Sequence, residues 1–379
     1  MKEIKFNIPL KDQKYFRNLI KFVKSKKSLH GPGENIHKTK KRLNDIFGFK
    51  YVHLTNSCTS ALEMSALLLN LKHNSEIVVP SYAFMTTASS FVRAGYKIRY
   101  CDIEKRTLMP SFNQIKKCVT RKTRAIVIVH YQGFSVNYLD KLQKFCKKKR
   151  IFLIEDAAQA LGSYFKKKPL GTFGDFGCFS FHHTKNLHSG IGGLIVINNK
   201  NYRKKSDFVF EKGTDRSLVI NDKQKYYSWV NLGSSFLLSE LHASFLLPQI
   251  NDLKEIIKLR SKIYNRYISN FNKWLDDEFI ICNEYIYKYN YHSFVIVLKK
   301  NIREKFLNFL KTKKIIAFIG YKSLHTSQMG KKFLQKKQKL KITDMVENKI
   351  VRLPLHNNLS LKEVDYISQN IKRFFLSKI

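Results

Sequence analysis

Short apolar runs alternate with helical patterns through the first two-thirds of this chain, and that alternation limits the folds that it can adopt. The apolar runs predict strands at residues 50–54, 76–79, 97–101, 125–129, 151–154, 178–181 and 193–197. Helical patterns lie between several of them, at residues 60–69, 86–94 and 139–149. Strands this apolar, separated by helices, predict a mostly parallel sheet that helices cover on both faces. The expected fold class is therefore α/β.

The length of the chain suits two lobes of one enzyme. It has 379 residues, which is more than one small domain needs. A long helical stretch from Ser239 to Trp274, broken near Pro248, leads to a further α/β pattern. We therefore expect a large domain over residues 1–250, which includes the N-terminal segment, and a small C-terminal domain over residues 251–379.

The composition excludes several classes of protein. The longest apolar runs, such as residues 126–129, are far too short to span a bilayer. The N-terminus lacks an apolar core followed by a cleavage site, which predicts a cytoplasmic protein without a signal peptide. The six cysteines are scattered and form no Cys-x-x-Cys pair, so we expect neither a metal site nor a disulfide framework.

The formal net charge of +42 admits two explanations. One is a polyanionic partner such as nucleic acid. The other is a compositional bias, because the lysines are spread along the chain and Phe, Tyr, Ile and Asn, whose codons are also A/T-rich, are abundant. The spread favours the second explanation and predicts no dedicated nucleic-acid function. Attraction of nucleotide diphosphates or anionic membranes by a basic surface stays open.

One lysine and one aspartate occupy positions that suggest a cofactor site. Lys185 lies between an aromatic strand and a glycine-rich turn, and Asp156 ends the apolar strand that begins at Ile151. Ligands collect at the carboxyl ends of the strands in such sheets. Pyridoxal phosphate needs a lysine that binds it covalently and an acid that keeps its ring nitrogen protonated. The alternative, that Lys185 is one surface lysine among many, does not explain the pairing of the two motifs.

The segment Asn56-Ser-Cys-Thr-Ser-Ala61 precedes an apolar helical run. Its small hydroxyl side chains suit a helix N-cap, and the free backbone N–H groups of a helix N-terminus suit a phosphate. Taken alone, the segment favours an ordinary helix cap.

These segments carry a family resemblance. Residues 57–62, 80–84, 155–159 and 179–186 resemble the nucleotide-sugar aminotransferases of the DegT/DnrJ/EryC1/StrS family. The likeness extends from about Phe6 to the C-terminus. It implies the fold of PLP-dependent transferases of fold type I, which is aspartate aminotransferase-like, with pyridoxal 5'-phosphate as the cofactor.

The resemblance also implies roles for individual residues, with Lys185 as the catalytic residue and covalent anchor. The other residues expected to contact the cofactor are Asp156 at the ring nitrogen, Gln159 at the phenolic oxygen, Phe84 stacked on the ring, and Thr59, Ser60, Ser180 and Ser235 at the phosphate. Ser235 would reach the phosphate of a neighbouring subunit, which implies a homodimer, although many relatives have Asn at that place. His325 is expected to contact the sugar substrate.

Residues 211–217, 232–236 and 351–360 resemble the members of this family that make dTDP-4-amino-4,6-dideoxygalactose. This resemblance implies transfer of the amino group of L-glutamate to dTDP-4-keto-6-deoxy-D-glucose, with 2-oxoglutarate as the second product, for cell-surface polysaccharide biosynthesis. Two residues depart from the pattern: His183 stands where the most similar members have Glu, and Ile191 stands where many have Glu.

Three alternative functions differ in the residues that they require. A dehydratase of the same fold would carry histidine in place of the lysine, so Lys185 argues against it. A non-catalytic basic binding protein would not need Lys185, Asp156 and Gln159 together. Amination at C3, or a product of gluco configuration, stays open because the residues alone do not separate these reactions.

Overall fold

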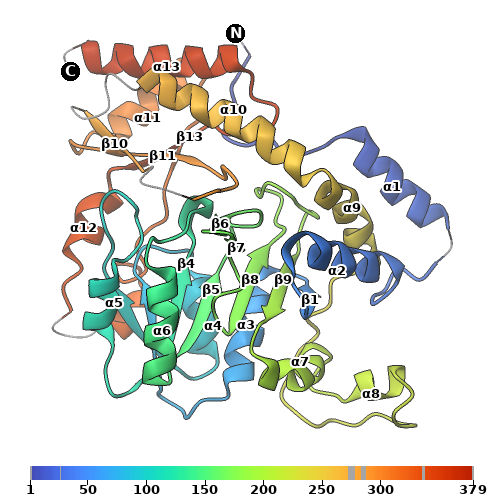
Figure 1. Ribbon diagram of the computed structural model, residues 1–379. Helices are drawn as coiled ribbons and strands as arrows, with labels where there is room; N and C mark the ends of the chain where they lie inside the picture. The colour runs from blue at the N-terminus through green and yellow to red at the C-terminus, as the bar shows by residue number, and fades with distance from the viewer. Residues whose placement is uncertain (1, 26, 272–277, 283–286, 335–337, 378–379) are drawn as a thin grey trace.

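A seven-stranded sheet forms the centre of the computed structural model, which describes residues 2–25, 27–271, 278–282, 287–334 and 338–377. The strand order is β1-β9-β8-β5-β4-β2-β3 (Figure 1). The strands are β1 (Val52–Thr55), β2 (Glu76–Pro80), β3 (Lys97–Cys101), β4 (Thr123–Val129), β5 (Phe152–Asp156), β8 (Phe176–Ser180) and β9 (Gly193–Ile197). Only β9 runs against its neighbours β1 and β8; the other pairs are parallel. The expected mostly parallel sheet is confirmed.

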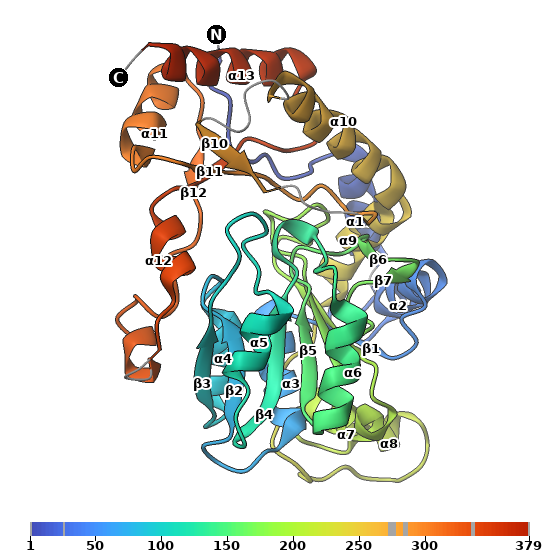
Figure 2. The same ribbon diagram turned by 60° about the vertical axis from the view of Figure 1, so that its left-hand side comes forward.

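Helices cover both faces of this sheet (Figures 1 and 2). The helices in this part of the chain are α1 (Gln13–Lys24), α2 (Glu34–Phe47), α3 (Cys58–Leu69), α4 (Thr86–Arg93), α5 (Phe112–Cys118), α6 (Leu139–Lys149), α7 (Arg203–Phe210) and α8 (Arg216–Ile220). α5 and α6 lie on one face, and α3 and α4 on the other. α3 is apolar around its circumference because α4 and α7 pack on the sides that the sheet leaves free. α6 instead turns Lys147, Lys148 and Lys149 outward at its C-terminal end, where cations suit the helix dipole.

A second, antiparallel sheet lies above the first in Figure 1, in the order β10-β11-β13-β12. Its strands are β10 (Phe279–Ile281), β11 (Phe294–Leu298), β12 (Phe318–Ile319) and β13 (Ile350–Leu353). The remaining helices are α9 (Glu240–Asn251), α10 (Leu253–Phe271), α11 (Arg303–Thr312), α12 (Lys341–Glu347) and α13 (Leu361–Leu376). Short elements are the hairpin β6 (Tyr164–Phe165) and β7 (Lys168–Pro169) and the 3₁₀ turns η1 (Tyr131–Gly133), η2 (Lys200–Tyr202) and η3 (Gly330–Phe333).

Two features bear on the expected division into domains. The long helical stretch is interrupted at Asp252, between α9 and α10, while Pro248 lies inside α9; its expected end at Trp274 falls outside the described residues. The N-terminal residues lie against the second sheet, since Ile4 pairs with Ile315 in a parallel bridge. The boundary between residues 250 and 251 stays a proposal.

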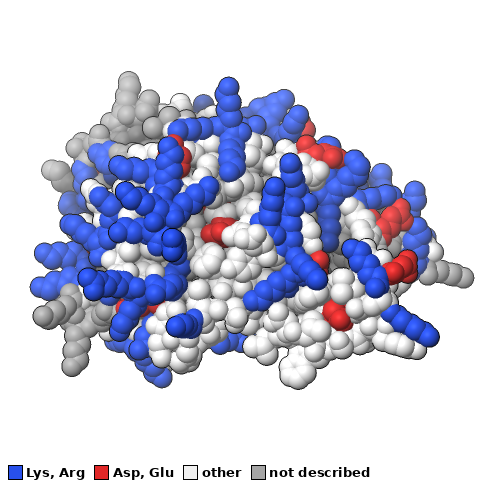
Figure 3. Space-filling model, turned by 60° about the horizontal axis from the view of Figure 1, so that its bottom comes forward, with Lys and Arg blue, Asp and Glu red and all other residues white. Residues whose placement is uncertain are grey.

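Basic side chains dominate the exposed surface. Figure 3 shows lysine and arginine over much of one face, with few acidic residues among them, as a net charge of +42 requires. Among the described helices, none is long and apolar enough to cross a bilayer.

Candidate active site

A cavity of about 450 Å³ lies where the carboxyl ends of the parallel strands face the second sheet. Its large-sheet wall includes the last residues of three neighbouring strands: Val129 of β4, Asp156 of β5 and Ser180 of β8. Its other wall includes Arg352 and Leu353 of β13. A ligand in this cavity would therefore touch both sheets.

Asp156 is a buried carboxylate in this cavity. Its side chain accepts hydrogen bonds from Thr87 Oγ1 at 2.6 Å and from the backbone N–H of Ala158 at 3.2 Å. Burial raises the pKa of Asp156, against the lowering effect of these two bonds. A carboxylate held ionised in such a place needs a cationic partner. A protonated pyridine ring supplies one, so the site fits pyridoxal phosphate at this point.

Lys185 lies in the loop between β8 and β9 and lines the same cavity. Its backbone N–H donates to the carbonyl of His182 at 2.8 Å, and within the described chain no side chain bonds or pairs with its Nζ. Burial, with a smaller contribution from the positive charge of Arg352, lowers the pKa of Lys185 to about 8, while Cys58 and Asp156 oppose the effect. An amine of this pKa is a competent nucleophile and base near neutral pH.

The expected aromatic and amide residues line the cavity as well. Phe84 exposes 46% of its surface, and its ring lies edge-on to Tyr321 at 5.8 Å between centroids. The Gln159 amide is fixed at both ends: its Oε1 accepts from the backbone N–H of Gln132 at 2.6 Å, and its Nε2 donates to the Tyr321 hydroxyl at 2.7 Å. Gln159 and Tyr321 therefore form one polar unit on the cavity wall.

The first turn of α3 forms another part of the wall. Ser57 caps this helix, because its Oγ accepts from the backbone N–H of Ser60 at 3.0 Å. Gly193 at the start of β9 lets the sheet approach this turn: a Cβ there would lie 2.3 Å from the carbonyl carbon of Ser57. The glycine thus holds a helix N-terminus at the cavity, which is a suitable environment for the cofactor phosphate.

Of the hydroxyl residues expected at the phosphate, Thr59 and Ser180 line the cavity. Ser60 does not. Its hydroxyl is hydrogen-bonded to Asn56 and Ser57 within the cap itself. The structure therefore places Ser60 in support of the turn rather than on the cavity wall.

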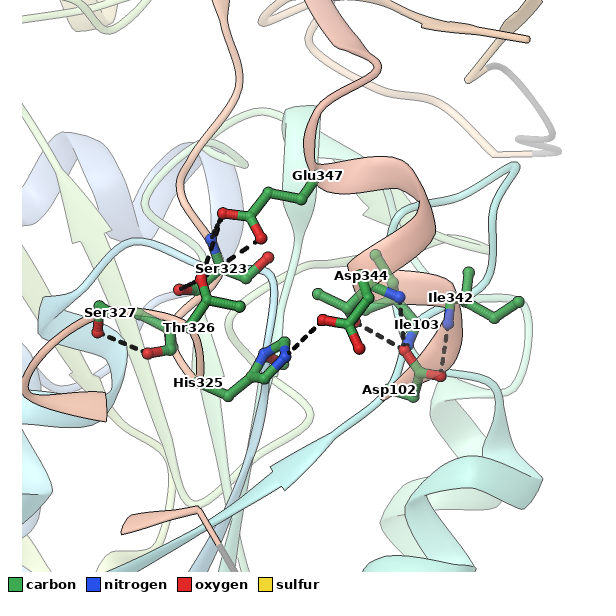
Figure 4. A network of polar contacts seen from close by, with 12 residues as sticks. Asp102, Ile103, Ser323, His325, Thr326, Ser327, Ile342, Asp344 and Glu347 are labelled. Carbon is green, nitrogen blue, oxygen red and sulfur yellow. Dashed lines mark hydrogen bonds and ion pairs between the residues drawn. The ribbon is translucent and has the colours of Figure 1, made fainter. Parts of the chain in front are cut away.

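Two predicted site residues lie away from this cavity. Ser235 is exposed and forms an isolated bridge with Glu211. His325 is buried, with Nδ1 2.5 Å from Ser81 Oγ and Nε2 2.8 Å from Asp344 Oδ1 (Figure 4). Both ring nitrogens of His325 thus have partners, one in each part of the chain. The side chain does not line the cavity, where contact with the sugar was expected.

Several residues of the site were missed in the sequence, among them Thr87, whose hydroxyl donates to Asp156. Thr87 follows Phe84 by three positions, and its place in the first turn after a strand end was a usable signal. His292 is buried at the cavity, where Nδ1 lies 3.1 Å from Asn186 Oδ1 and burial lowers its pKa well below the usual value. No local pattern marks His292. Of the two departures from the family pattern, Ile191 lines the cavity and His183 does not.

Comparisons with known proteins identify the family of this chain. Residues 9–372 match the model of the DegT/DnrJ/EryC1/StrS aminotransferase family. A GDP-perosamine synthase of Escherichia coli O157:H7 is 27% identical over 349 residues, which cover 91% of this chain and 92% of the relative. A UDP-4-amino-4,6-dideoxy-N-acetyl-β-L-altrosamine transaminase of Helicobacter pylori is 26% identical over 390 residues, covering 100% of this chain and 99% of the relative.

Among solved structures, the aminotransferase PseC of Helicobacter pylori, involved in the biosynthesis of pseudoaminic acid, superposes with a TM-score of 0.91. It is 24% identical, and the match covers 99% of this chain and 100% of PseC. At that identity the likeness establishes the fold, which is the expected fold type I.

Proposed function

The chain belongs to the DegT/DnrJ/EryC1/StrS aminotransferase family, and from that membership we propose that it aminates dTDP-4-keto-6-deoxy-D-glucose at C4 with L-glutamate as the donor. The products would be dTDP-4-amino-4,6-dideoxy-D-galactose and 2-oxoglutarate. The family consists of pyridoxal phosphate-dependent sugar aminotransferases, so the reaction class and the cofactor follow from membership. The observation that carries the proposal is one cavity lined by Lys185, Asp156 and Gln159.

The position and nucleotide of the sugar rest on weaker support. The name of the Helicobacter pylori relative specifies a 4-amino sugar, which favours C4. The names of the two relatives specify GDP and UDP, so they do not favour dTDP. The choice of dTDP and of the galacto product rests on the resemblance of residues 211–217, 232–236 and 351–360.

Bound pyridoxal phosphate supplies the electron sink for this chemistry. Asp156 would hold the proton on its ring nitrogen, and Thr87 fixes the orientation of that carboxylate. Lys185 Nζ would hold the cofactor covalently and would act as the base toward the α-carbon of the amino donor. Phe84 would cover the ring. The same amine would serve as the acid toward the sugar carbon that receives nitrogen.

The cofactor phosphate would bind at the N-terminal turn of α3. Thr59 and Ser180 offer hydroxyl groups there, and the backbone N–H groups of the first turn add the positive end of the helix dipole. Ser57 keeps this turn in place. These residues bind and orient; none of them needs to change its protonation state.

We further propose a homodimer in which Ser235 serves the phosphate site of the partner subunit. Ser235 is exposed and lies outside the cavity of its own chain. The preceding residues carry large exposed apolar side chains, including Tyr226 at 75%, Trp229 at 77% and Leu232 at 66% exposure. Apolar groups gathered in one exposed segment are typical of an interaction site.

The proposal is tested by incubation of the holoenzyme with dTDP-4-keto-6-deoxy-D-glucose and L-glutamate, followed by NMR of the product. An axial amine at C4 is expected. An equatorial 4-amine or an amine at C3 would reject the specific assignment and retain the aminotransferase. The matched GDP- and UDP-linked 4-keto sugars serve as competing substrates and decide the nucleotide.

A further inference from the structure

Arg352 is a cation at the cavity wall, and none of the residues that the structure describes serves as its anionic partner. It belongs to β13, and its guanidinium carbon lies 4.9 Å from the ring centroid of Phe6 and 6.0 Å from that of Tyr321. Its Nε atom is buried and has no hydrogen-bond partner. Within the described chain, no carboxylate forms an ion pair with this guanidinium.

An arginine in this state is costly to the folded protein. The Nε–H of Arg352 is a buried donor without an acceptor, and such a donor loses its hydration without gaining a compensating hydrogen bond. The charge of Arg352 also acts on its neighbours in the cavity, where it lowers the pKa values of Lys185 and His292. Asp156 would pair with the ring nitrogen of the cofactor and would not neutralise Arg352. The net charge of this part of the cavity is therefore positive, and a bound anion would neutralise it.

Two arguments identify that anion. The cofactor phosphate already has its own site at the first turn of α3, with Thr59 and Ser180. The field of Arg352 instead reaches Lys185, the group at which the amino donor reacts. In an α-amino acid one carbon separates the amine from the carboxylate, so the carboxylate must lie close to that reacting group. The planar fork of an arginine matches a carboxylate with two parallel hydrogen bonds.

We propose that Arg352 binds a carboxylate of the amino donor and that Phe6 holds its guanidinium in place for this contact. The inference rests on the proposed use of an amino-acid donor. Phe6 is itself fixed by Phe318, at 4.9 Å between ring centroids, and its carbonyl accepts from the backbone N–H of Leu355 at 3.4 Å. The N-terminal segment is thereby part of the donor site.

The test measures the donor half-reaction alone. Holoenzyme is mixed with L-glutamate without sugar, and the change in cofactor absorbance gives an apparent Kd. In Arg352→Gln this Kd rises roughly 10- to 100-fold, as expected for loss of a charge-assisted hydrogen bond. Arg352→Lys, which keeps the charge and the fold, shows a smaller rise. Arg93→Gln, the same change at an exposed arginine paired with Glu63, leaves the Kd unaltered.

Phe6→Leu separates the stacking from the charge. It keeps an apolar side chain and removes the aromatic face, so the donor Kd rises about 2- to 5-fold. An unchanged donor Kd in Phe6→Leu would overturn the role of Phe6. The role of Arg352 would then be decided by the Arg352 variants.

Donor analogues show which carboxylate is bound. 4-Aminobutyrate lacks the α-carboxylate of glutamate, and L-2-aminobutyrate lacks the side-chain carboxylate. The Arg352→Gln substitution weakens only the analogue that still carries the carboxylate bound by Arg352. Equal loss with both analogues and glutamate, or loss with neither analogue, would contradict a single carboxylate contact.

A second readout does not depend on catalysis. Calorimetry with 2-oxoglutarate and cofactor-free protein is expected to show weaker binding to Arg352→Gln than to the wild type. An unchanged donor Kd in Arg352→Gln, or a loss confined to nucleotide-sugar affinity in the pyridoxamine form, overturns the proposal. If the wild type reacts with glutamate but not with the dTDP sugar, the sugar assignment fails and the role of Arg352 stands.

Discussion

Burial of the Lys185 amine brings its pKa close to neutral pH. With a pKa of about 8, about a quarter of Lys185 is neutral at pH 7.5, against about one part in a thousand for an ordinary lysine. The neutral form is the one that attacks the cofactor aldehyde and accepts a proton. The cavity therefore supplies a base where an exposed lysine would supply a cation.

This pKa can be measured in cofactor-free protein. An amine-directed reagent such as trinitrobenzenesulfonate is expected to modify Lys185 in a distinct phase whose rate rises with pH and levels off above about 8. The direction follows from burial, which favours the neutral amine, so its reactivity appears at lower pH than that of other lysines. Lys185→Ala should lose both this phase and all turnover while remaining folded. A phase that still rises at pH 10 would show an unperturbed lysine.

Asp156→Asn should slow the donor half-reaction on the order of 100-fold, because a neutral amide cannot keep the ring nitrogen protonated. Single-turnover absorbance measures the rate. Thr87→Val is the matched control: it removes the 2.6 Å hydrogen bond but leaves the carboxylate charge, so its effect should be smaller. An unchanged rate and cofactor spectrum in Asp156→Asn would remove this carboxylate from the mechanism.

The site residues that could be predicted are those that end or follow strands of the large parallel sheet. Lys185, Asp156 and Phe84 were predicted because strand ends of a parallel sheet meet at one edge, and the cavity contains all three. Tyr321 and Arg352 were not. They arrive from the second sheet, and which of its side chains meets the cavity depends on packing that no local pattern records.

At the scale of elements, the segment that follows β12 is fastened to the end of β2. The backbone N–H of Tyr321 donates to the hydroxyl of Tyr82 at 3.0 Å, and that of Leu324 to the carbonyl of Ser81 at 2.8 Å. His325 adds the bond to Ser81 Oγ. The same β2 end leads directly to Phe84, so these contacts set the separation of the two walls.

Ser81→Ala tests this fastening. It leaves the buried Nδ1 of His325 without a partner, at a cost of about 1–3 kcal/mol. Amide hydrogen exchange over residues 320–325 should accelerate, as mass spectrometry would show. Ser261→Ala, the same substitution at an exposed serine with only a local bond, should change nothing in that segment. Equal exchange in both variants would mean that the bond to His325 does not hold the segment.

The positions of the strands in the large sheet were predictable, because their apolar runs are bounded by turn residues. The reversed direction of β9 was not. Its residues 193–197 have the same apolar composition as the parallel strands, and the chain returns from β8 through the Lys185 loop without a crossover helix, which makes the pair antiparallel. The direction of a strand depends on how it is connected to its neighbour, and the residues of the strand itself do not show this.

At the scale of the whole molecule, assembly should determine cofactor affinity. Light scattering of the wild type should give a dimer, and Trp229→Ser should give a larger monomer fraction with weaker cofactor binding. The exposed segment from Tyr226 to Leu232 would form the dimer interface, and Ser235, which follows it, would reach the partner's phosphate site only in the dimer. Leu376→Ser removes an exposed apolar side chain in α13 and serves as the control. A fully active monomer of the wild type would reject the composite site.

The pairing of Ile4 with Ile315 has a consequence for synthesis of the chain. Ile4 and Phe6 leave the ribosome long before the residues that they contact, so they have nowhere to dock until the residues around positions 315 and 352 have been translated. The large sheet can form earlier, since its last strand ends at Ile197. A nascent or truncated chain would therefore form the large-sheet wall of the cavity before Phe6 meets Arg352, and an added affinity tag is safer away from Phe6.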